Sequence, residues 1–130
     1  MESEGLVAVW LWSRSEGVFS HETALFLHDL SDALPARAHI TLPVAWKSRG
    51  LQIPDDVAVH YDKVPEPDRA WVGAVPVTSV RRTLADCLQS SVAPELVAQA
   101  STQAAERGLI TTEEILTAPA IGLWRMRLQR

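Results

Sequence analysis

Ser20, His21 and Asp86 are the residue types of a nucleophilic triad, in which serine attacks, histidine acts as its base and aspartate orients the histidine. Ser20 and His21 are adjacent, however, and adjacent side chains on a helix point in different directions. Ser20 also stands where it can cap the following helix by accepting a backbone N–H. The sequence has no nucleophile elbow and no Gly-rich oxyanion loop of the kind that accompanies such triads. We therefore predict no catalytic residues and a protein that is not an enzyme.

The four histidines are the residues best suited to bind a metal ion. His21 and His28 are seven residues apart, which on a helix separates them by about 10 Å along the axis. One ion with bonds of about 2 Å cannot bridge that distance. His39 and His60 would be cross-strand neighbours if their strands pair. Because neither an HExxH motif nor a Cys/His cluster is present, we expect half-buried, hydrogen-bonded histidines, with no metal and no cofactor.

Two adjacent arginines, Arg81 and Arg82, lie near a predicted helix N-terminus, where positive charge is disfavoured unless it is paired. The structural interpretation is that one of them pairs with Asp86, at i+4 from Arg82 or i+5 from Arg81, or with another acidic residue. The functional interpretation is contact with a phosphate or with an acidic partner surface. The other clustered cations are Lys47 and Arg49 in a predicted loop and Arg125, Arg127 and Arg130 at the C-terminus. Such clusters are typical of solvated segments, but a loop and a tail of this kind can also bind nucleic acid.

The elements that would position these side chains can be read from periodicity. The apolar run over residues 6–14 fits a helix better than a strand, and residues 20–35 combine an N-cap with apolar residues at helical spacing. Short β-branched runs predict strands at 38–42 and 57–61. Residues 71–77 resemble a short hairpin around Gly73-Ala74, with Pro76 at a sheet edge or strand end.

The second half of the sequence is predicted to be helical. Thr78 or Ser79 would cap one helix, and Pro94 would begin a longer helix that runs to about residue 107 and stops at Gly108. Thr111 and Glu114 form a capping box for a last short helix. No linker divides the chain. The predicted fold is α+β, a small, mostly antiparallel sheet packed with about five helices, helical at both ends, in a single domain.

Composition narrows the functional class. The chain has 130 residues, of which 47% are apolar, and a net charge of −4, so it binds polyanions poorly except through a local patch. Its single cysteine, Cys87, excludes an intrachain disulfide and favours a reducing compartment. The apolar run over residues 5–12 is too short to span a membrane, and acidic residues precede it where a signal peptide would carry positive charge. We expect a cytoplasmic protein without a membrane partner.

Two segments carry a resemblance to a known family: residues 20–35 (SHETALFLHDLSDALP) and residues 75–86 (VPVTSVRRTLAD). Both resemble the AbiEi family of antitoxins from bacterial abortive-infection toxin–antitoxin systems, which act in phage defence. The resemblance covers about residues 6 to 110 and includes, in the same order, the segments HITLP, VAVHY and AERGLIT. Family members usually carry an N-terminal winged helix-turn-helix, and residue 1 falls just before the second domain. The chain, residues 1–130, therefore resembles the C-terminal domain alone.

The resemblance implies a non-enzymatic domain that counteracts a nucleotidyltransferase-like toxin, in a type IV arrangement in which the antitoxin need not bind the toxin stably. The alternative is a DNA-binding or transcriptional regulatory fragment that acts with a winged helix-turn-helix partner. The residues that match the family pattern are Ser20, His21, Thr23, Thr78, Arg82 and Asp86. The candidate partner-binding residues are His21, Glu22, Arg81 and Arg82, and the candidate nucleic-acid contacts are Lys47, Arg49, Arg81 and Arg82.

The first predicted helix offers a further interface. A helix that is apolar all round must be covered either by the core or by a partner. If the winged helix-turn-helix of the family packs on this helix, Val7, Trp10 and Leu11 would be bare without it. Self-association into a homodimer would then cover them.

Overall fold

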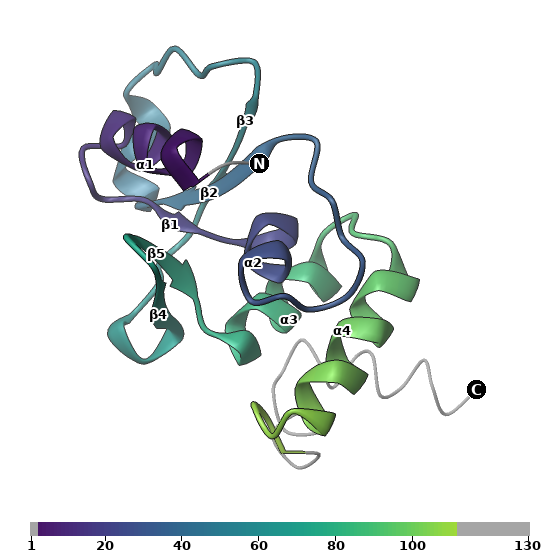
Figure 1. The fold of residues 1–130 in the computed structure, drawn as a ribbon. Coiled ribbons are helices and arrows are strands. Elements are labelled where there is room, and N and C mark those ends of the chain that lie inside the picture. The colour runs from purple at the N-terminus through teal and green to yellow at the C-terminus, as the bar shows by residue number, and fades with distance from the viewer. Residues whose placement is uncertain (1–2, 112–130) are drawn as a thin grey trace.

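The computed structural model describes residues 3–111 (Figure 1). Its α-helices are α1 (Ser3–Trp12), α2 (His21–Leu27), α3 (Val80–Gln89) and α4 (Pro94–Glu106). Its strands are β1 (Val18–Phe19), β2 (Ala38–Leu42), β3 (Val57–Tyr61), β4 (Arg69–Val72) and β5 (Val75–Thr78), and the short 3-10 helices are η1 (Val44–Ser48) and η2 (Glu66–Asp68). None of the helices in this part of the chain is long and apolar enough to cross a membrane.

The five strands form one mixed sheet in the order β3-β2-β1-β5-β4. The pairs β1–β2 and β4–β5 are antiparallel, whereas β2–β3 and β1–β5 are parallel. The prediction of a mostly antiparallel sheet with about five helices, helical at both ends, is therefore wrong: the sheet is mixed, and four α-helices accompany it within residues 3–111. The expected last helix, with Glu114 in its capping box, lies outside the described residues, as do the C-terminal arginines.

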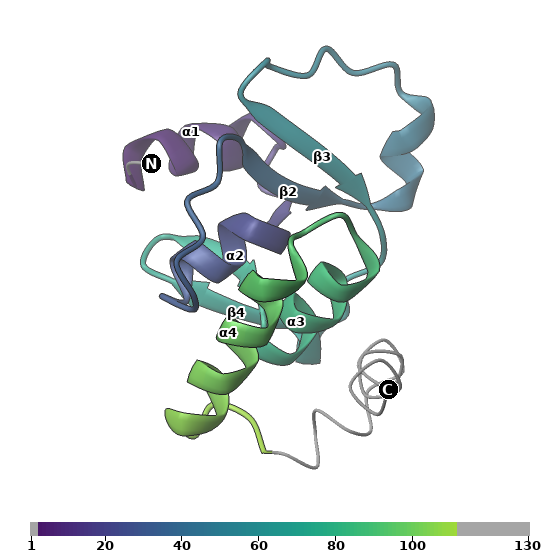
Figure 2. The same ribbon diagram turned by 90° about the vertical axis from the view of Figure 1, so that its right-hand side faces the viewer.

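The wrong prediction has a physical origin in the connection between β2 and β3. A β-branched run indicates a strand but not the direction of its partner. The two strands are joined by residues 43–56, which contain η1, and a connection of this length can cross over and return the chain in the same direction, whereas a tight hairpin cannot. Figure 2 shows this excursion beside β3.

The hairpin between β4 and β5 is confirmed. Val72 pairs with Val75, and Gly73 turns the chain with a φ of +58°, in the left-handed region that glycine adopts readily. Pro76, however, is not at a sheet edge, because β5 lies between β1 and β4. The missing N–H of this proline is tolerated because β1 pairs with β5 at Phe19 and Val77 alone.

Two apolar clusters form the core. One centres on the sheet and includes Phe19, Ile40 and Val77, with Leu6 of α1 packed against them. The other lies among α2, α3 and α4, which gather on one side of the sheet (Figure 2). The helix α2 contributes to both clusters, since Ala24 belongs to the first and Leu25 to the second. The N-terminus of α2 is therefore held firmly between the sheet and the helices.

The predicted interface residues of α1 differ in exposure. Val7 and Trp10 are half-buried and pack against the sheet cluster, and the ring of Trp10 meets that of Trp71 edge-on, with centroids 5.9 Å apart. Leu11 is 60% exposed. The core thus covers much of this helix, and self-association through it stays a prediction.

Gly17, in the turn between α1 and β1, gives the first testable prediction. A Cβ at this position would lie 2.7 Å from Cγ1 of Ile40 and 3.0 Å from Oγ of Ser13, closer than van der Waals contact. We expect Gly17→Ala to lower the free energy of unfolding by about 1–3 kcal/mol, because the core must shift to accept the methyl group. Urea denaturation measures the change.

The matched control is Gly5→Ala, in α1, where an added Cβ meets no atom within 4 Å. This variant should be as stable as the wild type or more stable by about 0.5–1 kcal/mol, because alanine favours the helix over glycine. If both variants unfolded at the same urea concentration, the close packing of Ile40 on Gly17 would be wrong.

Candidate functional site

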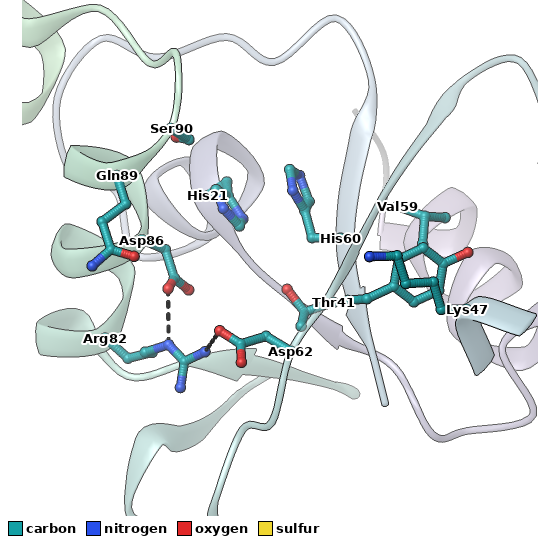
Figure 3. Close-up of a pocket in the computed structure, with 11 residues that line it drawn as sticks. His21, Thr41, Lys47, Val59, His60, Asp62, Arg82, Asp86, Gln89 and Ser90 are labelled. Carbon is teal, nitrogen blue, oxygen red and sulfur yellow. Dashed lines mark hydrogen bonds and ion pairs between the residues drawn. The ribbon is translucent and has the colours of Figure 1, made fainter. Parts of the chain in front are cut away.

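A polar cavity of about 340 Å³ lies where the start of α2, the strands β2 and β3, and the helix α3 meet (Figure 3). The start of α2 contributes His21, β2 contributes Thr41, and β3 contributes His60. The lining residues are His21, Thr41, Lys47, Val59, His60, Tyr61, Asp62, Arg82, Asp86, Gln89 and Ser90. The two segments that carry the family resemblance, which are far apart in the sequence, thus meet at one cavity through His21 on one side and Arg82 and Asp86 on the other (Figure 3).

Ser20 does not cap α2 as predicted. Its backbone occupies the N-cap position, but its side chain makes no cap hydrogen bond. Instead, Ser20 Oγ accepts a hydrogen bond from Thr41 Oγ1 at 2.7 Å and lies 2.8 Å from His21 Nδ1. Ser20 and Thr41 are buried, so the serine hydroxyl orients the histidine and is not presented to a substrate.

This hydrogen-bond chain favours one tautomer of His21. Burial, followed by the neighbouring His60, His39 and Arg82, lowers the pKa of His21 to about 3, so the ring is neutral at pH 7. Since Ser20 Oγ receives its hydrogen bond from Thr41, its own proton satisfies His21 Nδ1. From this network we assign the ring proton of His21 to Nε2, which makes that atom a hydrogen-bond donor.

The backbone of His21 is strained. Its φ is +55°, a left-handed conformation that costs a non-glycine residue about 1–2 kcal/mol. The buried hydrogen bonds of Ser20 and the packing of α2 hold it there. Residues in such conformations gather at binding and catalytic sites, where the surrounding structure maintains a side chain in one orientation.

Three imidazole rings lie against one another at the cavity. The rings of His21 and His60 are stacked, with centroids 3.7 Å apart and planes 14° apart. His39 Nδ1 lies 2.9 Å from His60 Nε2, which confirms the predicted cross-strand neighbours: β2 pairs with β3, and His60 lies diagonally across from His39. Both residues are half-buried, as expected. Burial, and then His39, lowers the pKa of His60 to about 4.

The geometry of the rings suits stacking better than metal binding. The lone pair of an imidazole nitrogen lies in the plane of its ring, so the lone pairs of two nearly parallel, stacked rings do not converge on one ion. Within residues 3–111, no group of three or more His, Cys, Asp or Glu residues is placed to hold a metal. His28 has a separate role, because its Nε2 lies 2.7 Å from the carbonyl oxygen of Thr78 and ties α2 to β5.

Arg82 is the centre of an ion-pair network at the other side of the cavity (Figure 3). Its Nε donates to Asp86 at 2.9 Å, which confirms the predicted pair, and its two Nη atoms donate to Asp68 at 3.0 Å and Asp62 at 2.9 Å. Ser79 caps α3 by accepting from the backbone N–H of Arg82 at 3.2 Å. The unfavourable position of this arginine near a helix N-terminus is thus offset by three carboxylates.

Asp86 carries an unsatisfied atom at this wall. Its Oδ1 accepts from Arg82, while its Oδ2 is buried without a hydrogen-bond partner. Burial raises the pKa of Asp86, although the hydrogen bond and charge of Arg82 oppose the change. A buried, unpartnered carboxylate oxygen is costly, and like the strained His21 it marks this cavity as a functional candidate.

The cavity brings together only some of the residues that the sequence singled out. His21, Arg82 and Lys47 line it, whereas Glu22 is half-buried outside the lining and Arg81 is exposed. Arg49 lies over the ring of Trp46, 4.6 Å from its centroid.

The residues that sequence reasoning missed are Thr41, Asp62, Asp68, Gln89 and Ser90. A signal for one of them was present in HITLP, where Thr41 alternates with the core residues of β2 and so lies on the polar face of the strand. Comparisons of the sequence with known protein families and with curated proteins found no match.

Proposed function

We propose that this chain is an antitoxin-type domain that counteracts a nucleotidyltransferase-like toxin of a bacterial abortive-infection system. The observation that supports the proposal most strongly is the convergence of His21 with Arg82 and Asp86, which come from the two segments that resemble AbiEi antitoxins, at one polar cavity. The helices α2 and α3, which carry these motifs, pack against each other, and this packing brings the motifs to the same cavity.

We further propose that the domain acts in the cytoplasm by binding and not by catalysis. Ser20 is fully buried, so its hydroxyl is unsuited to attack a substrate. The thiol of Cys87 is buried, and burial raises its pKa, which disfavours the reactive thiolate.

The alternative, a DNA-binding regulatory fragment, has less support from the geometry. Arg82 has three carboxylate partners and therefore has little capacity left for phosphate. Arg49 is stacked on Trp46. Lys47 and Arg81 are the exposed cations that remain of the four candidate contacts, and two cations give only a small electrostatic footprint.

Growth rescue tests the proposed function. The nucleotidyltransferase gene nearest to this one is expressed from an inducible promoter, with or without this chain. We expect the wild-type chain and Lys63→Ala to restore growth and His60→Gln to fail, because Lys63 lies outside the cavity lining and His60 within it. Circular dichroism checks that each variant is folded. A folded wild-type chain that leaves growth arrested would refute the antitoxin role.

A further inference from the structure

We infer that the cavity beside His21 and His60 binds a small molecule in which a planar nitrogen heterocycle is joined to a phosphate, as in a nucleoside monophosphate. The inference goes beyond the antitoxin role and stands without it. Its size is suitable, since about 340 Å³ falls within the range of roughly 300–1,000 Å³ that small-molecule sites occupy.

The heterocycle is indicated by the aromatic wall. His21 and His60 form a stack of two nearly parallel rings at the cavity, whereas Tyr61, the next residue of β3, points to the other face of the strand. Histidine rings are common stacking partners of nucleobases. Stacking tolerates different bases, because each base has a flat π-face.

The phosphate is indicated by the donors that remain available. Arg82 is occupied by three carboxylates, so Lys47 is the lining cation that can meet an anion. No ion pair of Lys47 occurs among residues 3–111. The neutral His21 adds an N–H donor at Nε2, in the tautomer that we assign from the hydrogen bonds of Ser20. The lysine ammonium is the group that suits phosphate oxygens.

The charges of the lining favour a ligand that has both an anionic end and an uncharged end over a simple anion. Lys47 and Arg82 are balanced by Asp62 and Asp86, so the cavity as a whole is not a positively charged anion site. A free phosphate would gain from Lys47 but would be repelled by the carboxylates. A ligand with an anionic end at Lys47 and an N–H-bearing, uncharged end towards the carboxylates, Gln89 and Ser90 avoids that repulsion.

Two costly features of the wall agree with a binding site. His21 keeps a left-handed backbone, and Ser20 gives up its capping bond to orient the ring of His21. The apolar residues Ala24 and Leu25 supply the contacts of α2 with the two core clusters. Both costly features are explained if the position of His21 Nε2 matters to a ligand.

The test is a titration of the folded chain at about pH 7.5. Binding is measured by calorimetry and by the changes in amide chemical shifts. The probes are the four common nucleoside monophosphates, the matching nucleosides and inorganic phosphate. We expect at least one monophosphate to bind with a Kd of about 1 mM or below, and at least about tenfold more tightly than its nucleoside or phosphate alone. The shifted amides should lie around His21, His60 and Lys47.

Variants separate the two parts of the ligand. Lys47→Ala should weaken the monophosphate about tenfold and leave the nucleoside unchanged, because it removes one charge-assisted contact. Lys63→Ala, which removes the other lysine of the chain, should change neither. The inference is overturned if no monophosphate binds the folded protein at up to about 10 mM, if phosphate alone binds as tightly, or if the two lysine variants behave alike.

Discussion

Replacing Arg82 with alanine is expected to lower the free energy of unfolding by about 2–4 kcal/mol, the largest effect we expect from one substitution at the cavity. The side chain of Arg82 is 14% exposed, and those of Asp68 and Asp86 are 19% and 11% exposed. Without the guanidinium, two mostly buried carboxylates lose their counter-charge, and the Oδ1 of Asp86 joins its Oδ2 in having no partner. Asp62 is 63% exposed and should contribute little.

Arg81→Ala is the matched control, because Arg81 is the adjacent residue on α3 and is exposed. Its free energy of unfolding should stay within about 0.5 kcal/mol of the wild type. Denaturant unfolding at pH 7 measures both variants. Equal losses for Arg81→Ala and Arg82→Ala would mean that the carboxylates do not depend on Arg82.

A double variant measures the coupling. Asp86→Asn removes the charge that Arg82 balances, so adding it to Arg82→Ala should cost less than the sum of the two single changes. The difference is expected to be about 0.5–3 kcal/mol, the range for residues that share an ion-pair network. Additive losses would show that the pair contributes no coupling of its own.

The parts of this structure that the sequence predicted correctly depend on residues close together in the chain. The i,i+4 pair of Arg82 with Asp86, the cap at Ser79 and the Gly73-Ala74 hairpin each follow from local spacing. His39 and His60 are the exception. Their contact was foreseen only on the condition that two strands pair, a condition that periodicity cannot test.

The parts that were missed depend on tertiary competition. Ser20 has the residue type of a helix cap. Its side chain instead forms hydrogen bonds with the hydroxyl of Thr41 and the ring of His21, because both of these groups are buried beside it. Asp62 and Asp68 reach Arg82 from the segment after β3, which no spacing rule connects to α3. Strand direction was missed for the same reason, since it is set by where the 43–56 connection packs.

These misses coincide with the candidate site. The strained His21, the diverted Ser20 and the unpartnered Asp86 oxygen each break a local rule at one cavity, although left-handed residues (Arg14, Ser15, Asp29 and Ser31) and unpartnered indole N–H groups (Trp10 and Trp46) also occur elsewhere in residues 3–111. Proteins that violate local preferences commonly do so where function requires it. The failures of local prediction therefore support the same location as the resemblance, from independent observations.

The histidine stack predicts a loss of stability in mild acid. In the folded protein the pKa of His21 is about 3 and that of His60 is about 4, whereas an unfolded histidine has a pKa of about 6.5. Between these values the unfolded chain binds protons that the folded chain does not. Stability is therefore fully present above about pH 6.5 and falls as the pH is lowered, until the folded rings are protonated near pH 4 and pH 3.

The size of this effect is large for a small domain. At about pH 5 each of the two rings is expected to reduce the free energy of unfolding by up to about 2 kcal/mol relative to pH 7, and by less for His60, which solvent reaches in part. Their sum of up to about 4 kcal/mol is a substantial share of the 5–15 kcal/mol that stabilises a typical domain. Denaturant unfolding at a series of pH values should therefore show falling midpoints below about pH 6.5.

A variant with His21→Asn and His60→Gln isolates this contribution, because neither new side chain titrates. It should be less stable than the wild type at pH 7, where the neutral stack is intact, and the difference should shrink by up to about 4 kcal/mol towards pH 5. A constant difference would mean that the rings do not titrate with lowered pKa values.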